Sequence, residues 1–215
     1  MPFRLFKRNS TATDALEVIT VVSGLPRSGT SMMMRMLEAG GLPVITDQLR
    51  VPDESNPKGY YELERVKQMK EGNVGWISEG KGKVVKIISA LLGELPSEHQ
   101  YRIVFMQRNM DEILASQREM LLRRGEPTDR ISDRELAEFY QNHLAQVTEW
   151  LAKQPNMQVI YLHYNQILED PDAPIAQLCQ FLQPFSLDQD RMLSVVESSL
   201  YRQRASTVRN PVQQI

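Results

Sequence analysis

The chain has 215 residues, of which 41% are hydrophobic and 24% are charged, and its formal net charge is −2. This composition excludes a disordered chain, and the charge balance excludes a protein drawn to nucleic acid or acidic lipid by overall attraction. Any anion site must therefore be local. The apolar runs, such as residues 18–25 (VITVVSGL), are shorter than the roughly 20 residues of a membrane span.

The first ten residues (MPFRLFKRNS) lack the apolar core of a secretory signal, and the single Cys179 excludes an internal disulfide. Both features favour a cytoplasmic location. No repeat or linker divides the sequence, so we expect one domain over residues 1–215, with a core at 17–183 and a helical or basic tail at 184–215.

Four runs rich in Val, Ile and Tyr predict strands that are buried on both faces. They are residues 18–23, 84–89, 102–107 and 158–163, and residues 42–46 (LPVIT) are a candidate fifth strand. Helical patterns at 30–39, 110–124, 133–153 and 173–182 alternate with these strands. This order predicts an α/β fold with a doubly wound, mainly parallel sheet of four or five strands flanked by helices.

Two further stretches of the chain carry large apolar or aromatic side chains. In the helix at 30–39, we expect Met33, Met36 and Leu37 to pack on the sheet. Residues 47–64 predict a long excursion beside the ligand edge of the sheet. Its Tyr60–Tyr61 pair and the later Trp76 are either packing residues or one wall of an acceptor site.

The first predicted strand runs into a glycine-rich loop, GLPRSGTS (24–31). Gly24 and Gly29 have the separation of a Walker A loop and Ser31 has the offset of its hydroxyl, but Thr30 stands where the lysine belongs. Backbone N–H groups at the start of a helix would bind an anion here. Without the lysine a triphosphate lacks its main cation, whereas Arg27 brings a guanidinium into the loop. The alternative is an ordinary strand-to-helix turn.

The segment GLPRSGTSMMMRML resembles the 5′-phosphosulfate loop of the sulfotransferase superfamily, and its PRSGT form is closest to tyrosylprotein sulfotransferases and bacterial relatives. These enzymes transfer a sulfuryl group from 3′-phosphoadenosine 5′-phosphosulfate (PAPS). The resemblance, which spans about residues 17–183, implies a P-loop-containing nucleotide-binding fold with PAPS as co-substrate and no metal. It also implies that Arg27 contacts the leaving phosphate and the transferring group. The 5′ end would be held by Ser28, Gly29, Thr30 and Ser31.

Two later segments match the same superfamily. Arg108, after a predicted strand, and Ser116, eight residues on, match the pair that holds the 3′-phosphate of the cofactor. Tyr164 falls on a tyrosine that lies near the adenine in relatives, with Asn165 in place of the usual glutamate. The tail arginines, represented by Arg204, match a late basic segment that closes over the cofactor, although a solvated tail fits them equally well.

The sequence differs from the superfamily pattern at the base that takes the acceptor's proton. Cytosolic small-molecule sulfotransferases carry Lys-Thr-His in the strand at 84–89; here Lys86 matches the lysine, but Ile88 falls on the histidine base. Lys86 is either an aid to charge stabilisation or a boundary residue. In tyrosylprotein sulfotransferases a glutamate about twenty residues after the loop arginine is the base; here Gln48 is at the match and Asp47 is one position away. The resemblance therefore implies a carboxylate base, with Asp47 first and Glu62 and Glu54 behind it.

The histidines and cysteine are the remaining residues that bear on the choice of function. We expect His99 and His143 to be bystanders and His163 to approach the ligand edge, and the spacing of His and Cys indicates no metal site. The predicted function is transfer of a sulfuryl group to a hydroxyl or amine of a small-molecule, glycan or peptide acceptor, with no nucleic acid or membrane partner. The alternatives are a P-loop small-molecule kinase and a non-catalytic nucleotide-binding module.

Overall fold

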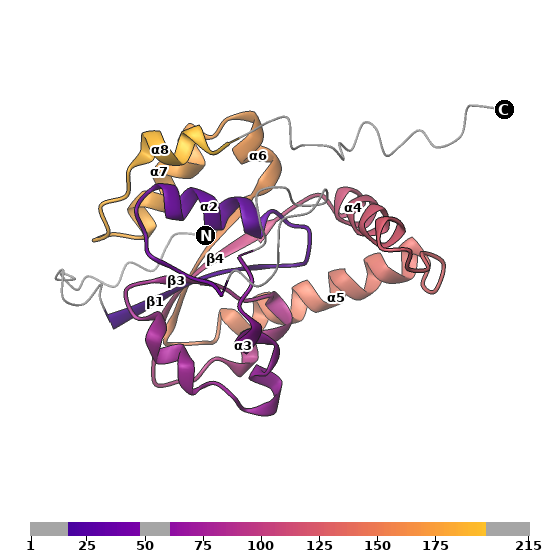
Figure 1. The fold of residues 1–215 in the computed structure, drawn as a ribbon, viewed down its shortest axis with the longest axis horizontal. Coiled ribbons are helices and arrows are strands. Elements are labelled where there is room, and N and C mark those ends of the chain that lie inside the picture. The colour runs from indigo at the N-terminus through magenta and orange to yellow at the C-terminus, as the bar shows by residue number, and fades with distance from the viewer. Residues whose placement is uncertain (1–16, 48–60, 197–215) are drawn as a thin grey trace.

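The computed structural model describes residues 17–47 and 61–196 and shows a five-stranded parallel sheet with helices on both faces (Figure 1). The strands lie in the order β2-β3-β1-β4-β5. They are β1 (Val18–Gly24), β2 (Val44–Ile45), β3 (Val84–Lys86), β4 (Gln100–Gln107) and β5 (Met157–His163). The predicted α/β class, the parallel sheet and the fifth strand within 42–46 are confirmed.

This strand order indicates which edge of the sheet would bind a ligand. From β1 the chain forms β2 and β3 on one side, and then it crosses to β4 and β5 on the other side. A crevice is expected beyond the carboxyl ends of strands where the order reverses, which is here at β1 and β4. The register pairs Val22 with Lys86 and Gly24 with Met106, so the chain segments that follow β1, β3 and β4 leave the sheet at one edge.

One face of the sheet is covered by α2 (Thr30–Ala39), α6 (Tyr164–Glu169), α7 (Asp172–Phe181) and α8 (Gln189–Ser194). Met33, Met36 and Leu37 of α2 are fully buried, as predicted. Met32 and Met34 are buried as well. This wider apolar surface arises because α8 packs on α2, so α2 lies between two layers and not only on the sheet.

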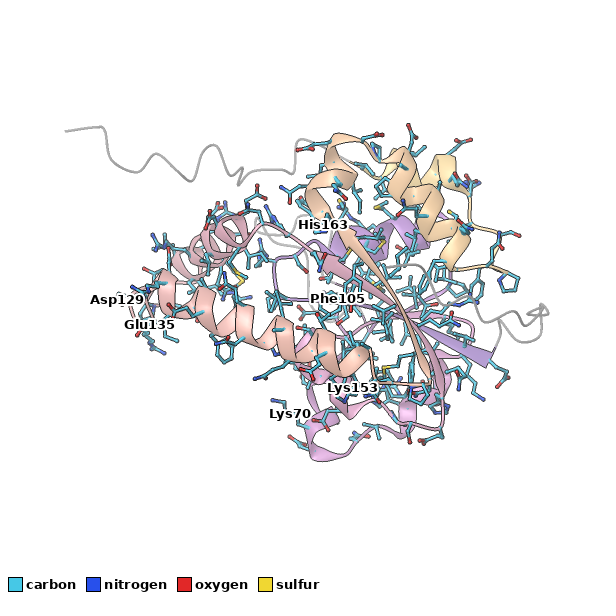
Figure 2. The ribbon with its side chains drawn as sticks, turned by 180° about the vertical axis from the view of Figure 1, so that it is seen from behind. Lys70, Phe105, Asp129, Glu135, Lys153 and His163 are labelled. Carbon is cyan, nitrogen blue, oxygen red and sulfur yellow. The ribbon has the colours of Figure 1, made fainter. Side chains whose placement is uncertain are left out.

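The other face is covered by α5 (Asp133–Leu151), by α3 (Glu64–Lys67) and by 3₁₀ segments at 69–71, 75–80 and 89–94. Trp76 is buried in this core, so it serves packing. The helix α4 (Met110–Arg123) follows β4 and, with the first half of α5, forms an arm beyond the sheet, in which Asp129 and Glu135 lie far from Phe105 (Figure 2). No helix of residues 17–47 and 61–196 is long and apolar enough to cross a membrane.

Some boundaries differ from the predictions for physical reasons. The strand predicted at 84–89 ends at Lys86, because the chain turns into the 3₁₀ segment at 89–94, whose N-cap is Ile88. Asp170 ends α6, a helix that the sequence did not predict, and Pro171 occupies the N-cap of α7.

The burial of α2 can be tested with one matched pair of leucines. Leu37 is 0% exposed and Leu122 on α4 is 62% exposed. We expect Leu37→Ala to lower the free energy of unfolding by about 2–5 kcal/mol, because it leaves a cavity between the sheet and α8. Leu122→Ala should change it by less than about 0.5 kcal/mol. Urea denaturation followed by circular dichroism measures both; equal losses would contradict this placement of α2.

Candidate functional site

The loop between β1 and α2 has the backbone of an anion-binding turn. Gly24 and Gly29 have positive φ angles of 144° and 98°, and Arg27 is left-handed with φ 69°, a conformation that is uncommon without glycine. Gly29 is the N-cap of α2, and no side chain caps this helix or places an acid in its first turn. The N–H groups at this end of α2 therefore retain their capacity to bind an anion.

Within the loop, Ser28 points into the protein. Its side chain is 1% exposed, and its hydroxyl has no hydrogen-bond partner in the described part of the chain. A Cβ added to Gly24 would lie 2.6 Å from this hydroxyl and 2.6 Å from the carbonyl oxygen of Met106. Glycine at 24 is thus required by both its φ angle and its surroundings, and the buried Ser28 hydroxyl packs against Gly24 instead of facing solvent.

Three residues predicted to bind the nucleotide come together above the loop. Arg27 donates from Nε to Oγ of Ser116 on α4 at 2.9 Å. Arg108, just beyond β4, donates from Nη1 to the carbonyl oxygen of Arg27 at 3.0 Å. The resemblance assigned Arg27 to the 5′ end and the other two residues to the 3′-phosphate, and these two groups are in direct contact here.

Tyr164 closes the same corner from the end of β5. Its ring lies against Gly29 so closely that a Cβ at position 29 would overlap it, and the Arg108 guanidinium carbon lies 4.5 Å from the ring centroid. Burial raises the pKa of the Tyr164 phenol above its usual value, with the charge of Arg108 acting in the opposite direction. The phenol is therefore neutral near pH 7 and presents a flat surface beside two arginines.

A buried acid completes this cluster, and the sequence reasoning did not identify it. Glu112 on α4 is 0% exposed and accepts a hydrogen bond from Arg108 Nε at 3.0 Å. Asn165 donates to both of its carboxylate oxygens at 3.1 Å. The signals available in the sequence were the four-residue spacing of Arg108 and Glu112, which suits an ion pair on one turn, and the asparagine at the glutamate position.

On the other side of the loop, Lys86 ends β3 with its side chain turned toward α2. It is 9% exposed, and its Nζ lies 3.5 Å from Oγ of Ser31. Two residues further on, Ile88 is 39% exposed, so an apolar side chain reaches solvent at the position of the usual histidine. The structure thus places the Lys86 side chain beside the loop, and the position of the usual histidine base holds the uncharged Ile88.

The carboxylates predicted as bases lie past β2. Asp47 accepts a hydrogen bond from the backbone N–H of Glu64 at 2.5 Å, and the Thr46 hydroxyl donates to the carbonyl oxygen of Glu62 at 2.9 Å. These bonds hold the two ends of the excursion together beside the sheet edge. Three predicted residues, Glu54, Tyr60 and Arg204, lie outside the described residues.

The three histidines and Tyr61 lie at other positions in the fold. His143, expected to be a bystander, approaches Ser89 with Nε2 2.8 Å from Oγ, and burial lowers the pKa of its imidazole. His163 is exposed at the end of β5 (Figure 2), and His99 lies before β4. Tyr61 donates to the Glu38 carboxylate on α2. Within residues 17–47 and 61–196, no three His, Cys, Asp or Glu side chains gather in a way that could hold a metal ion.

Comparison with known proteins gives a family match and two similar folds. The model of the sulfotransferase domain family matches residues 19–211. A sulfotransferase from Mycobacterium tuberculosis superposes with a TM-score of 0.55 at 17% identity, covering 90% of this chain and 76% of that one. The sulfotransferase domain of an olefin synthase from Synechococcus gives a TM-score of 0.50 at 13% identity, covering 90% and 82%. No curated protein sequence matches the chain.

The family match covers most of the chain and includes the loop, Arg108, Ser116 and Tyr164. The two superposed structures share the P-loop-containing α/β fold, in which a glycine-rich loop joins the first strand to a helix. The chain therefore belongs to the sulfotransferase domain family.

Proposed function

We propose that this protein transfers a sulfuryl group from PAPS to a hydroxyl or amine of a small-molecule, glycan or peptide acceptor. The observation that carries the proposal is the hydrogen bond between Arg108 and the loop carbonyl of Arg27, with Ser116 bonded to the Arg27 side chain. It joins the residues that the family resemblance assigns to the two ends of one nucleotide.

The residues of the site fit such a donor. The uncapped start of α2 would hold the 5′ end through Gly29, Thr30 and Ser31. Arg108 and Ser116 would hold the 3′-phosphate, and Tyr164 would pack near the base. PAPS supplies an activated sulfuryl group on a phosphate leaving group. Arg27, and Lys86 through its position beside Ser31, supply positive charge where that leaving group gains negative charge.

On the acceptor side, Asp47 is the proposed base. It follows β2, whose carboxyl end lies at the same sheet edge as the loop, and the Glu64 N–H fixes its carboxylate. A carboxylate that is held in one orientation can accept the acceptor's proton without reorganising at the moment of reaction. Glu62 is the second candidate, and its backbone is fixed by Thr46.

Neither alternative function accounts for the site as well. A P-loop kinase requires a lysine at the position of Thr30 to neutralise the β- and γ-phosphates of ATP. A kinase also has no use for an arginine-serine pair beside the 3′ position of the nucleotide. A non-catalytic module would keep that pair but would need neither Lys86 nor Asp47 in place.

Nucleotide binding separates these functions. We expect 3′-phosphoadenosine 5′-phosphate (PAP) to bind without Mg²⁺, and at least about tenfold more tightly than adenosine 5′-phosphate, because one charge-assisted hydrogen bond contributes roughly 1.5–3 kcal/mol. Isothermal titration calorimetry with chelator present measures both affinities. Equal affinity for the two nucleotides, or a requirement for Mg²⁺, would contradict the assignment.

Transfer itself tests the role of Asp47. We expect the wild-type protein to move labelled sulfate from PAPS to members of a panel of phenols, amines, glycans and tyrosine peptides. Asp47→Asn should lower the rate by about 10²–10⁴-fold, the usual contribution of a general base, because the amide cannot accept the proton. PAP affinity should stay unchanged. Glu62→Gln serves as the matched control, and a larger loss in that variant would move the base to Glu62.

A further inference from the structure

The carboxylate of Glu112 is unusual for its location. It is fully buried at the start of α4, beside the place proposed for a dianionic 3′-phosphate. A buried carboxylate is costly unless it is paired and hydrogen-bonded, and a negative charge next to a phosphate opposes binding. A residue with both costs needs a compensating role.

The contacts of Glu112 show how the first cost is met. Oε2 accepts from Arg108 Nε at 3.0 Å, and both oxygens accept from the Asn165 amide at 3.1 Å. The Asn109 side chain caps α4 by accepting from the N–H groups of Asp111 and Glu112 at 2.9 and 3.4 Å. The acid is therefore fixed from the helix backbone, from β4 through Arg108 and from α6 through Asn165.

These contacts determine the pose of Arg108. Its Nε edge is bonded to Glu112, its Nη1 is bonded to the Arg27 carbonyl oxygen, and one face of the guanidinium lies over the Tyr164 ring. An arginine side chain is long and loses much rotamer freedom when it binds a ligand. Here that ordering is completed before any nucleotide arrives, so less of the binding free energy is spent on it.

We propose that Glu112 and Asn165 are positioning residues that hold Arg108 in its phosphate-binding pose, and that Asn165 does so without adding charge. This inference rests on the proposed function, because it concerns recognition of the 3′-phosphate. Glu112 is a carboxylate bonded to Arg108, and Asn165, which is bonded to Glu112, is neutral, so the summed charge of Arg27, Arg108 and Glu112 is positive. An acid at 165 would cancel that excess and would place two carboxylates against each other.

The rival interpretation is that Glu112 only stabilises the fold by joining α4 to α6. Overall stability cannot separate the two roles, because loss of a buried ion pair destabilises the protein in either case. The difference in affinity between two nucleotides can. A positioning role predicts a loss confined to the 3′-phosphate, whereas a purely structural role predicts equal loss for nucleotides with and without it.

The experiment is calorimetry with PAP and adenosine 5′-phosphate on wild type, Glu112→Gln and the uncharged Asn165→Leu, with Glu119→Gln as control. Glu119 lies on the same helix and pairs with Arg123. We expect both site variants to lose about tenfold or more in PAP affinity, the scale of one charge-assisted hydrogen bond, with less than about a threefold change for adenosine 5′-phosphate. The control should match wild type for both nucleotides.

Each outcome either supports or overturns the positioning role of Glu112 and Asn165. Equal losses for both nucleotides, or no loss for PAP, would overturn the positioning role. If Glu112→Gln fails to fold by circular dichroism, Asn165→Leu decides alone, since it removes the two hydrogen bonds to Glu112 with nearly the same side-chain volume and no added charge. A wild-type protein that binds the two nucleotides equally would refute the proposed function itself, which separates that failure from failure of this inference.

Discussion

The hydrogen bond from Arg108 to the carbonyl oxygen of Arg27 is the contact on which the candidate nucleotide site depends. Arg108 follows β4 and Arg27 follows β1, and these strands are neighbours in register. A carbonyl oxygen that pointed into the loop would repel an anion. Arg27 has a left-handed backbone conformation, and its carbonyl oxygen accepts a hydrogen bond from Arg108. The loop can therefore present N–H groups to an anion instead. One bond thus sets the polarity of the loop and the position of the guanidinium.

The site also shows how a chain with net charge −2 can build a place for a highly charged anion. Arg27 and Arg108 lie together, and the fully buried Glu112 pairs with Arg108, whose side chain is 8% exposed. Asn165 supplies hydrogen bonds to that acid without charge. The positive excess is therefore local, and it is directed toward the loop because Glu112 occupies the opposite side of Arg108.

The sequence was sufficient for features that depend on strand ends. The positions of Arg27 and Arg108 followed from apolar runs that end in polar residues, and a parallel sheet brings such ends together. Glu112 was missed because an acid in the first turn of a helix is ordinary, and only the tertiary fold turns it toward Asn165. The strand at 84–89 was predicted too long because its apolar composition does not reveal that the chain turns into a 3₁₀ segment at Ser89.

The acceptor side depends on a different kind of structure. Asp47 and Glu64 are joined by one hydrogen bond, and Thr46 is joined to Glu62 by another, so the excursion starts and finishes at the end of β2. That point lies next to β3, whose end carries Lys86 and the exposed Ile88. The donor site rests on strand ends and a helix N-terminus, which tolerate little change. A loop closed at its base can vary without disturbing them. If the proposed function holds, changes in this loop would alter acceptor choice and leave the proposed donor site in place.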